Sequence, residues 1–141
     1  MLAAAKLVRR KIASGSPWEP VVGYSRAVAA GDYIFVSGCT STDAGGLVHA
    51  GDAAAQAAQA IVNLRDALER LGAGLADVVR TRMFVTDIAR WEEYGAAHRA
   101  AFAAAMPAAT MVEVAALVDP RMLIEIEAVA YRPGAGGTAA R

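Results

Sequence analysis

The fold is decided by one stretch of sequence, Pro107-Ala-Ala-Thr-Met-Val-Glu-Val-Ala-Ala-Leu-Val-Asp-Pro-Arg-Met-Leu-Ile-Glu-Ile-Glu-Ala-Val-Ala130. Apolar and polar residues alternate at 110–115 and again at 123–131, which is the period-2 pattern of half-buried strands. Asp119-Pro120 between them is a turn signal, because proline cannot donate to a strand ladder. The stretch therefore predicts two strands joined by a tight connection.

Outward from this stretch, the chain supplies further strands and two helices. The predicted strands cover residues 7–12, 27–28, 33–37 and 78–85, and the predicted helices cover 52–71 and 87–105. Gly31-Asp32 suits a hairpin turn between the second and third strands. Asp52 can cap the first helix and Gly72 can end it. Two segments rich in glycine, serine or proline are expected to be loops, 14–20 and 42–51.

These elements predict an α+β fold, a single mixed β-sheet of about six strands with two helices packed on one face. The uncovered face is expected to carry charged side chains together with an aromatic and a sulfur-bearing one: Arg80, Arg82, Glu113, Glu125, Glu127, Phe84 and Met111. Several carboxylates on one sheet face need positive groups, a partner subunit or water to meet them. We therefore expect the chain to oligomerise through this face, with charges paired across it or between subunits.

The chain also carries a series of motifs that resembles the RidA/YjgF family. The motifs are GYSRAV at 23–28, DYIFVSGCTS at 32–41, VVRTRMFVTD at 78–87, PAATMVEVAALV at 107–118 and MLIEIEAVA at 122–130. They are similar to the family's motifs in order and in spacing, over about residues 20–131. The resemblance implies a chorismate-mutase-like fold and a homotrimer, in which three sheets form an inner barrel and pockets lie between neighbouring subunits.

Length and composition indicate one domain. The 141 residues are enough for one core, so we assign 1–132 to a single RidA-like domain and the Gly- and Ala-rich 133–141 to a flexible C-terminal tail. The zero net charge gives no general attraction to nucleic acid or to an anionic membrane. The single cysteine excludes an internal disulfide. With no signal-peptide pattern and no apolar stretch of membrane-spanning length, a cytoplasmic protein is expected.

Motifs for cofactors and metals are missing from the sequence. It contains no Walker loop, no dinucleotide-binding glycine pattern and no nucleophile elbow. The two histidines, His49 and His98, are far apart in sequence and define no ligand pair. We therefore expect neither a cofactor nor a metal site, and the resemblance implies a small molecule as the ligand.

Glu125 is the candidate catalytic residue. The resemblance implies that this glutamate helps to hold or activate the water that attacks an imine carbon. A carboxylate suits that role because it can accept a proton from water at a geometry fixed by the strand. The alternative is a structural charge in the trimer interior, opposite Arg80 or Arg82.

Ala109 is the main departure from the family pattern. The resemblance places there, in the deaminating branch, an arginine that grips the substrate carboxylate by a two-pronged hydrogen bond. Loss of such a partner costs about 1.5–3 kcal/mol, roughly ten- to a hundred-fold in affinity. Little or no hydrolysis of 2-iminopropionate is therefore expected. Arg26 is the candidate replacement, because it points the same way as Tyr24 if the segment is extended. The alternative for Arg26 is a surface ion pair with Asp32.

Further candidate ligand contacts are Tyr24, Gly38, Cys39, His98 and Met111, and three of them, Tyr24, Cys39 and His98, have structural alternatives. The resemblance places Tyr24 and the Gly38-Cys39 turn on the pocket wall, and His98 on the helix that borders the pocket. The alternatives are a loop aromatic that fills a gap, a small packed thiol, and a helix-face histidine that touches the sheet or an interface.

Two functions from different classes follow. The first is hydrolysis of an imine, an enamine or a related carbonyl compound with a non-standard substrate, favoured by Glu125, Tyr24 and the Ser37-Gly38 turn. The second is a non-catalytic trimer that binds or senses a metabolite, favoured by Ala109. Ribonuclease activity has also been attached to the family, but zero net charge and the lack of a histidine pair or basic stripe oppose it here.

Overall fold

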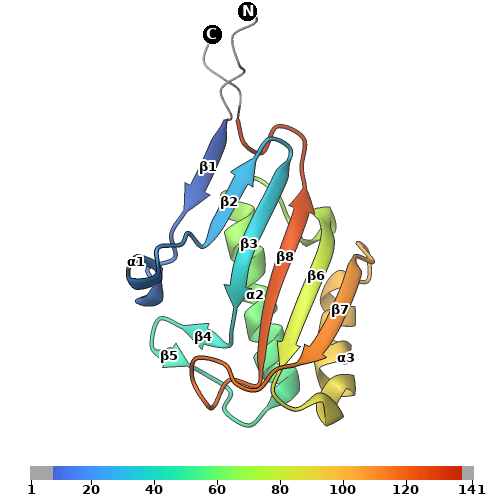
Figure 1. Cartoon of the computed structure of the whole chain (residues 1–141). Helices are drawn as coiled ribbons and strands as arrows, with labels where there is room; N and C mark the ends of the chain where they lie inside the picture. The colour runs from blue at the N-terminus through green and yellow to red at the C-terminus, as the bar shows by residue number, and fades with distance from the viewer. Residues whose placement is uncertain (1–7, 138–141) are drawn as a thin grey trace, which may run out of the picture.

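The computed structural model describes residues 8–137, which form a six-stranded mixed sheet and a small separate hairpin (Figure 1). The sheet order is β1 (Arg9–Ile12), β2 (Ala27–Ala30), β3 (Tyr33–Cys39), β8 (Ile124–Tyr131), β6 (Val78–Val85) and β7 (Ala108–Glu113). All neighbouring strands are antiparallel except β6 and β7, which are parallel. The hairpin pairs β4 (Thr42–Asp43) with β5 (Gly46–Leu47). The predicted α+β fold with a mixed sheet is confirmed.

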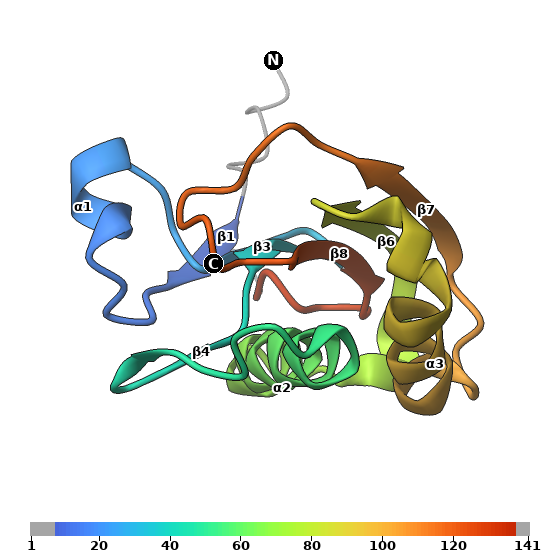
Figure 2. The same cartoon turned by 90° about the horizontal axis from the view of Figure 1, so that it is seen from below.

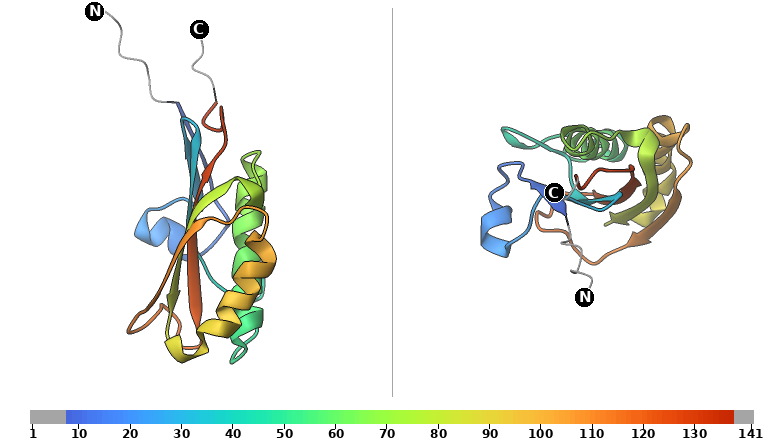
Figure 3. Two further views of the ribbon diagram at one scale, coloured as in Figure 1. Left: turned by 90° about the vertical axis from the view of Figure 1, so that its right-hand side faces the viewer. Right: turned by 90° about the horizontal axis from the view of Figure 1, so that it is seen from above.

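Two long helices, α2 (Ala53–Arg70) and α3 (Trp91–Phe102), cover one face of the sheet (Figure 3). Asp52 caps α2 as predicted, because its carboxylate accepts from the Ala55 amide at 3.0 Å. Short 3₁₀ turns at Leu75–Asp77 and Ile88–Arg90 precede β6 and α3. A third helix, α1 (Trp18–Val22), lies on the other side of the sheet from α2 (Figure 2). The prediction of a plain loop at 14–20 is therefore wrong in its second half.

The core lies between the sheet and the two long helices. Leu64 and Leu68 of α2 and Tyr94 of α3 are fully buried against Ile34 and Ile126 of the sheet. Burial of each large apolar side chain contributes roughly 1.5–3 kcal/mol. This packing fixes the covered face and leaves the other face of the sheet open.

The predicted tight connection between the last two strands is wrong. β6 lies between β7 and β8, and β6, α3 and β7 form a crossover unit with parallel strands. Because β6 lies between them, β7 and β8 are not neighbours in the sheet, so a tight turn cannot join them. The Asp119-Pro120 turn instead sits within a longer segment that links β7 to β8 on the open side of the sheet (Figure 2).

The phase of β8 is as predicted, but that of β7 is reversed. Glu125 and Glu127 alternate with buried residues and lie on the open face. Met111 pairs with the buried Met83, so Met111 lies on the helix-covered side. Glu113 lies on the same side and accepts from the Ile88 amide at 3.1 Å. Alternation shows that successive side chains point to opposite faces, but not which set faces the core. In the edge strand β7 both faces are largely exposed, so the sequence offers no clear difference between them.

Strand β6 agrees with the prediction except at its start. The alternation that places Arg80, Arg82 and Phe84 on the open face predicts that Val79 points inward, but Val79 is 45% exposed and Val78 is 2% exposed. The pairing register with β8 shifts between Val78 and Arg80, so an irregularity there turns Val79 outward. Arg82 lies on the open face as predicted and forms a salt bridge with Glu127 at 3.2 Å.

The C-terminal segment is hydrogen-bonded to the β2–β3 turn as far as Gly136. The Gly134 amide donates to the Asp32 carboxylate at 2.9 Å, and the Gly136 amide donates to the Gly31 carbonyl at 2.8 Å. Ala135 is buried. The folded part therefore continues beyond residue 132, whereas 138–141 of the predicted tail and Leu7 of the predicted first strand lie outside the described residues.

Candidate functional site

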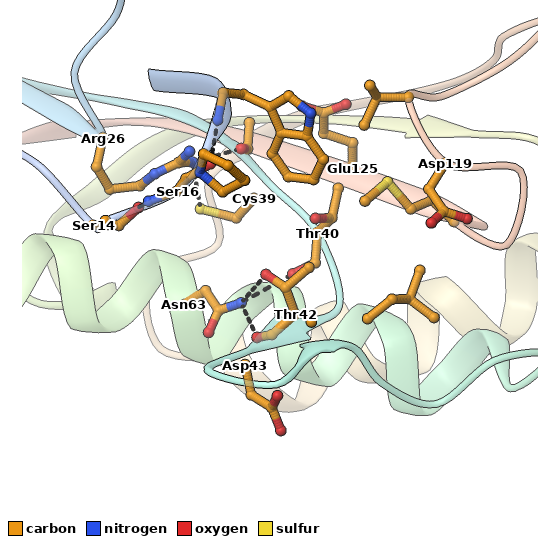
Figure 4. Close-up of a pocket in the computed structure, with 18 of the residues that line it drawn as sticks. Ser14, Ser16, Arg26, Cys39, Thr40, Thr42, Asp43, Asn63, Asp119 and Glu125 are labelled. Atoms are coloured by element: carbon orange, nitrogen blue, oxygen red, sulfur yellow. Dashed lines mark hydrogen bonds between the residues drawn. The ribbon is translucent and has the colours of Figure 1, made fainter. Parts of the chain in front are cut away.

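An open cavity of about 1000 Å³ lies beside the ends of β3 and β8 (Figure 4). Its walls come from segments far apart in sequence: residues 14–26, 38–47, 63–70 and 118–125. Five of the predicted site residues line it: Tyr24, Arg26, Gly38, Cys39 and Glu125. The other three, His98, Ala109 and Met111, are not among its lining residues. The structure thus divides the predicted site into two groups.

Arg26 is held at the cavity wall by four acceptors. Its Nη1 donates to the carbonyls of Gly38 at 2.6 Å and Ser37 at 3.3 Å, and to Cys39 Sγ at 3.5 Å. Its Nη2 donates to the Tyr24 hydroxyl at 3.3 Å. The predicted shared direction of Tyr24 and Arg26 is therefore present, and these contacts fix the guanidinium in one orientation.

The alternative prediction, an Arg26–Asp32 ion pair, is wrong. The Asp32 carboxylate accepts from the Gly134 amide at 2.9 Å, at the far end of the β2–β3 hairpin. Within residues 8–137, Arg26 forms no salt bridge with any carboxylate. Arg26 is thus a half-buried cation in the cavity whose polar contacts are all uncharged.

Glu125 lies against Gly38. The predicted turn at Gly38-Cys39 is wrong, because β3 runs on to Cys39 and only its register with β8 shifts between Val36 and Cys39. A Cβ atom added to Gly38 would stand 2.0 Å from Glu125 Oε1 and 2.8 Å from its Cγ, so only glycine leaves room for this carboxylate. Burial raises the pKa of Glu125, the charge of Arg26 opposes that rise, and the charge of Glu127 adds to it. In the described part of the chain the carboxylate has no hydrogen-bond partner, which leaves its oxygens available to water or a ligand.

Cys39 is a packed thiol at the end of β3. It is 3% exposed, and its Sγ donates to the Ser37 carbonyl at 3.4 Å. Burial raises the pKa of the thiol, although the nearby charge of Arg26 acts in the opposite direction. A thiol kept protonated is a poor nucleophile, so the geometry favours a structural role for Cys39.

The cavity wall formed by α1 was missed in the sequence. Glu19 is buried, and its carboxylate accepts from the amides of Ser14 and Ser16 at 3.0 and 3.1 Å and from the Ser14 hydroxyl. Burial raises the pKa of Glu19, but these hydrogen bonds and the charge of Arg26 outweigh it and lower the pKa overall. Ser16-Pro-Trp-Glu19 matches the capping-box pattern and could have revealed the helix. These hydrogen bonds fix residues 14–22, which place Trp18 and Val22 on the cavity wall.

The second group lies around α3 and β7, across β6 from the cavity group. His98 Nε2 and Thr81 Oγ1 are hydrogen-bonded at 2.9 Å, and Thr81 pairs with Ala109. The His98 ring contacts Phe102 at a centroid distance of 4.6 Å, and burial lowers the pKa of His98. A small cavity of about 190 Å³ borders His98 and Phe102. Ala109 and Met111 lie on the opposite face of the sheet from Glu125.

Residues 8–137 contain no group of three or more histidine, cysteine, aspartate or glutamate side chains arranged to hold a metal ion. None of the helices in this range is both long and apolar enough to cross a membrane. The cavity combines the half-buried Glu125 carboxylate and the fixed Arg26 guanidinium with apolar side chains. Its other charged lining residues are exposed or paired: Asp43, Asp66, Arg70, and the ion pair of Asp119 with Arg121.

Comparisons with known proteins agree on one family. Residues 15–132 match the family model described as Endoribonuclease L-PSP. The crystal structure of a YjgF/YER057c/UK114 family member from Mycobacterium tuberculosis superimposes with a TM-score of 0.80 at 48% identity, over 87% of this chain and 98% of that one. The 3-aminoacrylate deaminase RutC of Acinetobacter baylyi is 34% identical over 83% of this chain and 92% of its own. The human 2-iminobutanoate/2-iminopropanoate deaminase is 32% identical over 91% and 93%.

Proposed function

Because this chain belongs to the RidA/YjgF family, whose matched model is described as Endoribonuclease L-PSP, we propose that it hydrolyses a small imine or enamine in the cavity beside Glu125. The observation that carries the proposal is the Glu125 carboxylate, which is half-buried, faces the cavity and has no hydrogen-bond partner in the described chain. The names of two relatives give the same substrate class, an enamine in one and imines in the other.

The reaction needs one group that first takes and then returns a proton. Glu125 holds a water and accepts its proton while the water oxygen bonds to the imine carbon. From a protonated imine, the resulting carbinolamine receives that proton on nitrogen, and its hydroxyl proton passes back to Glu125 as the C–N bond breaks to give the carbonyl compound and ammonia. The raised pKa of Glu125 suits both steps, because a weaker carboxylic acid is a stronger base and still returns the proton.

We further propose that the chain is a homotrimer joined through the open sheet face. Tyr33, Phe35 and Tyr131 lie on that face and are 46%, 49% and 44% exposed. A patch of large exposed aromatic side chains on a regular sheet favours coverage by another protein surface. In such an assembly a neighbouring copy would supply the residues that the cavity lacks within one chain.

The test is an assay of ammonia release from imines generated in place by an amino-acid oxidase acting on a panel of amino acids. We expect turnover with at least one member, and we expect Glu125→Gln to lower it by about 10²–10⁴-fold. The matched control is Glu127→Gln, on the same strand and face but paired with Arg82 outside the cavity. The proposal fails if no member exceeds the buffer rate, or if both variants turn over like the wild type.

A second candidate is a trimer that binds a metabolite without turnover. Ala109 favours it, because a methyl group cannot grip a substrate carboxylate as the arginine implied by the resemblance would. The two functions separate in one comparison, because a binder would hold a stable carboxylate probe without accelerating any imine hydrolysis.

A further inference from the structure

Arg26 keeps one edge of its guanidinium free in the cavity. The group has five N–H donors in a rigid fork. Nη1 faces Gly38, Ser37 and Cys39, and Nη2 faces the Tyr24 hydroxyl. Nε donates to no acceptor in residues 8–137, and the single bond from Nη2 leaves its other N–H without one. Nε–H and the second N–H of Nη2 are therefore both available to donate to a carboxylate.

The charge of Arg26 is also uncompensated at short range. It forms no salt bridge in the described part of the chain. Its charge acts to lower the pKa of Glu19 and of Glu125, but neither carboxylate is within salt-bridge distance of it. A half-buried guanidinium that is fixed, faces a cavity and lacks a contacting anion is a binding position for one.

We propose that Arg26 holds the carboxylate of the ligand, so that the anion grip and Glu125 come from the same chain and the same cavity wall. This assignment rests on the proposed function and deepens it. The substrate class is a small imine or enamine monocarboxylate whose apolar part packs on Trp18, Val22, Val118 and Met122, which line the same cavity. An alanine at position 109 is then tolerated, because Arg26 supplies the carboxylate grip from the same chain as Glu125.

The test measures binding rather than turnover, with 2-oxobutanoate as the probe, its amide as the uncharged match and inorganic phosphate as the other anion. Calorimetry on the wild type should show binding of 2-oxobutanoate and markedly weaker binding of the amide and of phosphate. Arg26→Gln should weaken 2-oxobutanoate roughly 10- to 100-fold. Arg65→Gln removes the same charge from an exposed site on α2 and should leave the affinity unchanged.

Arg26 also donates hydrogen bonds to the Ser37 and Gly38 carbonyls of β3, so the test must separate a loss of structure from a loss of binding. Arg26→Lys keeps the charge without the fork, and should bind 2-oxobutanoate with intermediate affinity at an unchanged melting temperature. The proposal is overturned if the wild type does not bind 2-oxobutanoate, if amide or phosphate binds as tightly, or if folded Arg26→Gln keeps wild-type affinity. Glu125→Gln distinguishes this proposal from the hydrolytic function, because it should abolish turnover and still bind 2-oxobutanoate.

Discussion

The two groups of predicted site residues differ in how the fold joins them. Gly38 and Glu125 lie on the neighbouring strands β3 and β8. Tyr24 and Arg26 lie on the segment just before β2, and contacts within one chain link all four. His98, Ala109 and Met111 lie beyond β6, on the opposite face. A ligand beside Glu125 can therefore meet the cavity group in one chain, but it can meet the β7 group only if another copy supplies it.

Gly38→Ala gives the largest expected effect on the cavity group. The added methyl would stand 2.0 Å from Glu125 Oε1 and 2.8 Å from its Cγ, so the carboxylate must leave its position. We expect imine turnover to fall by about 10²-fold or more, because general-base catalysis contributes about that much. Overpacking should also lower the free energy of unfolding by about 1–3 kcal/mol.

The control for this prediction is Gly95→Ala in α3. A Cβ atom at Gly95 meets nothing within 4 Å, so the substitution should raise helix stability by up to about 1 kcal/mol. Turnover of Gly95→Ala should match the wild type. Wild-type turnover in Gly38→Ala would show that the position of Glu125 against Gly38 does not matter for activity.

The second prediction asks whether another copy brings the two groups together. The proposed trimer uses the open face, where Phe35 is half-exposed. Light scattering at micromolar concentration should return three times the chain mass for the wild type, and Phe35→Asp should return the monomer mass, because burial of an unpaired carboxylate is costly. A monomeric wild type would contradict the proposed trimer, because His98, Ala109 and Met111 could then not reach the cavity of a neighbouring copy.

The sequence was sufficient to predict most strands, the two long helices and five residues that line the cavity, but not the connection of the last two strands. Alternation in β8 specified both period and phase, because one face is wholly apolar and buried. Tyr24, Gly38 and Glu125 were placed by motif resemblance, and Arg26 by direction along an extended segment. β7 was misjudged because an edge strand gives no such contrast, so Met111 and Glu113 were assigned to the wrong face. The pinning of α1 by Glu19 depends on a buried carboxylate that composition alone does not reveal.

Gln56→Leu should destabilise the segment between β7 and β8, and we expect it to affect stability rather than turnover. Gln56 is fully buried; its Nε2 donates to the carbonyls of His49 and Arg121, and its Oε1 accepts from the Leu123 amide at 2.8 Å. Leucine fills the space but leaves these backbone groups unpaired, which should cost about 2–4 kcal/mol in urea unfolding. Gln59→Leu, on the same helix but half-exposed, should cost less than about 1 kcal/mol. Equal losses in both variants would contradict a special role for the Gln56 contacts.

The smallest expected effect concerns the titration of His98. Burial lowers the pKa of His98 below its ordinary value, so its imidazole is neutral at neutral pH. The unfolded chain then binds more protons than the folded chain between the two pKa values. The free energy of unfolding should therefore rise as the pH rises between the two pKa values, and fall again on acidification. His98→Gln should reduce this dependence of the unfolding free energy on pH.

The same titration tests whether α3 meets a ligand. The chain has two histidines, so proton NMR shows two imidazole Hε1 signals, and the signal that is lost in His98→Gln belongs to His98. If a neighbouring copy places its cavity against α3, 2-oxobutanoate should shift the His98 signal, because a carboxylate nearby favours the charged imidazole and raises its pKa. We expect that upward shift in the wild type and its absence in the Phe35→Asp monomer. An unmoved signal in a trimer that binds 2-oxobutanoate would mean that the ligand lies far from α3 of every copy, and the cavity group would then be the whole site.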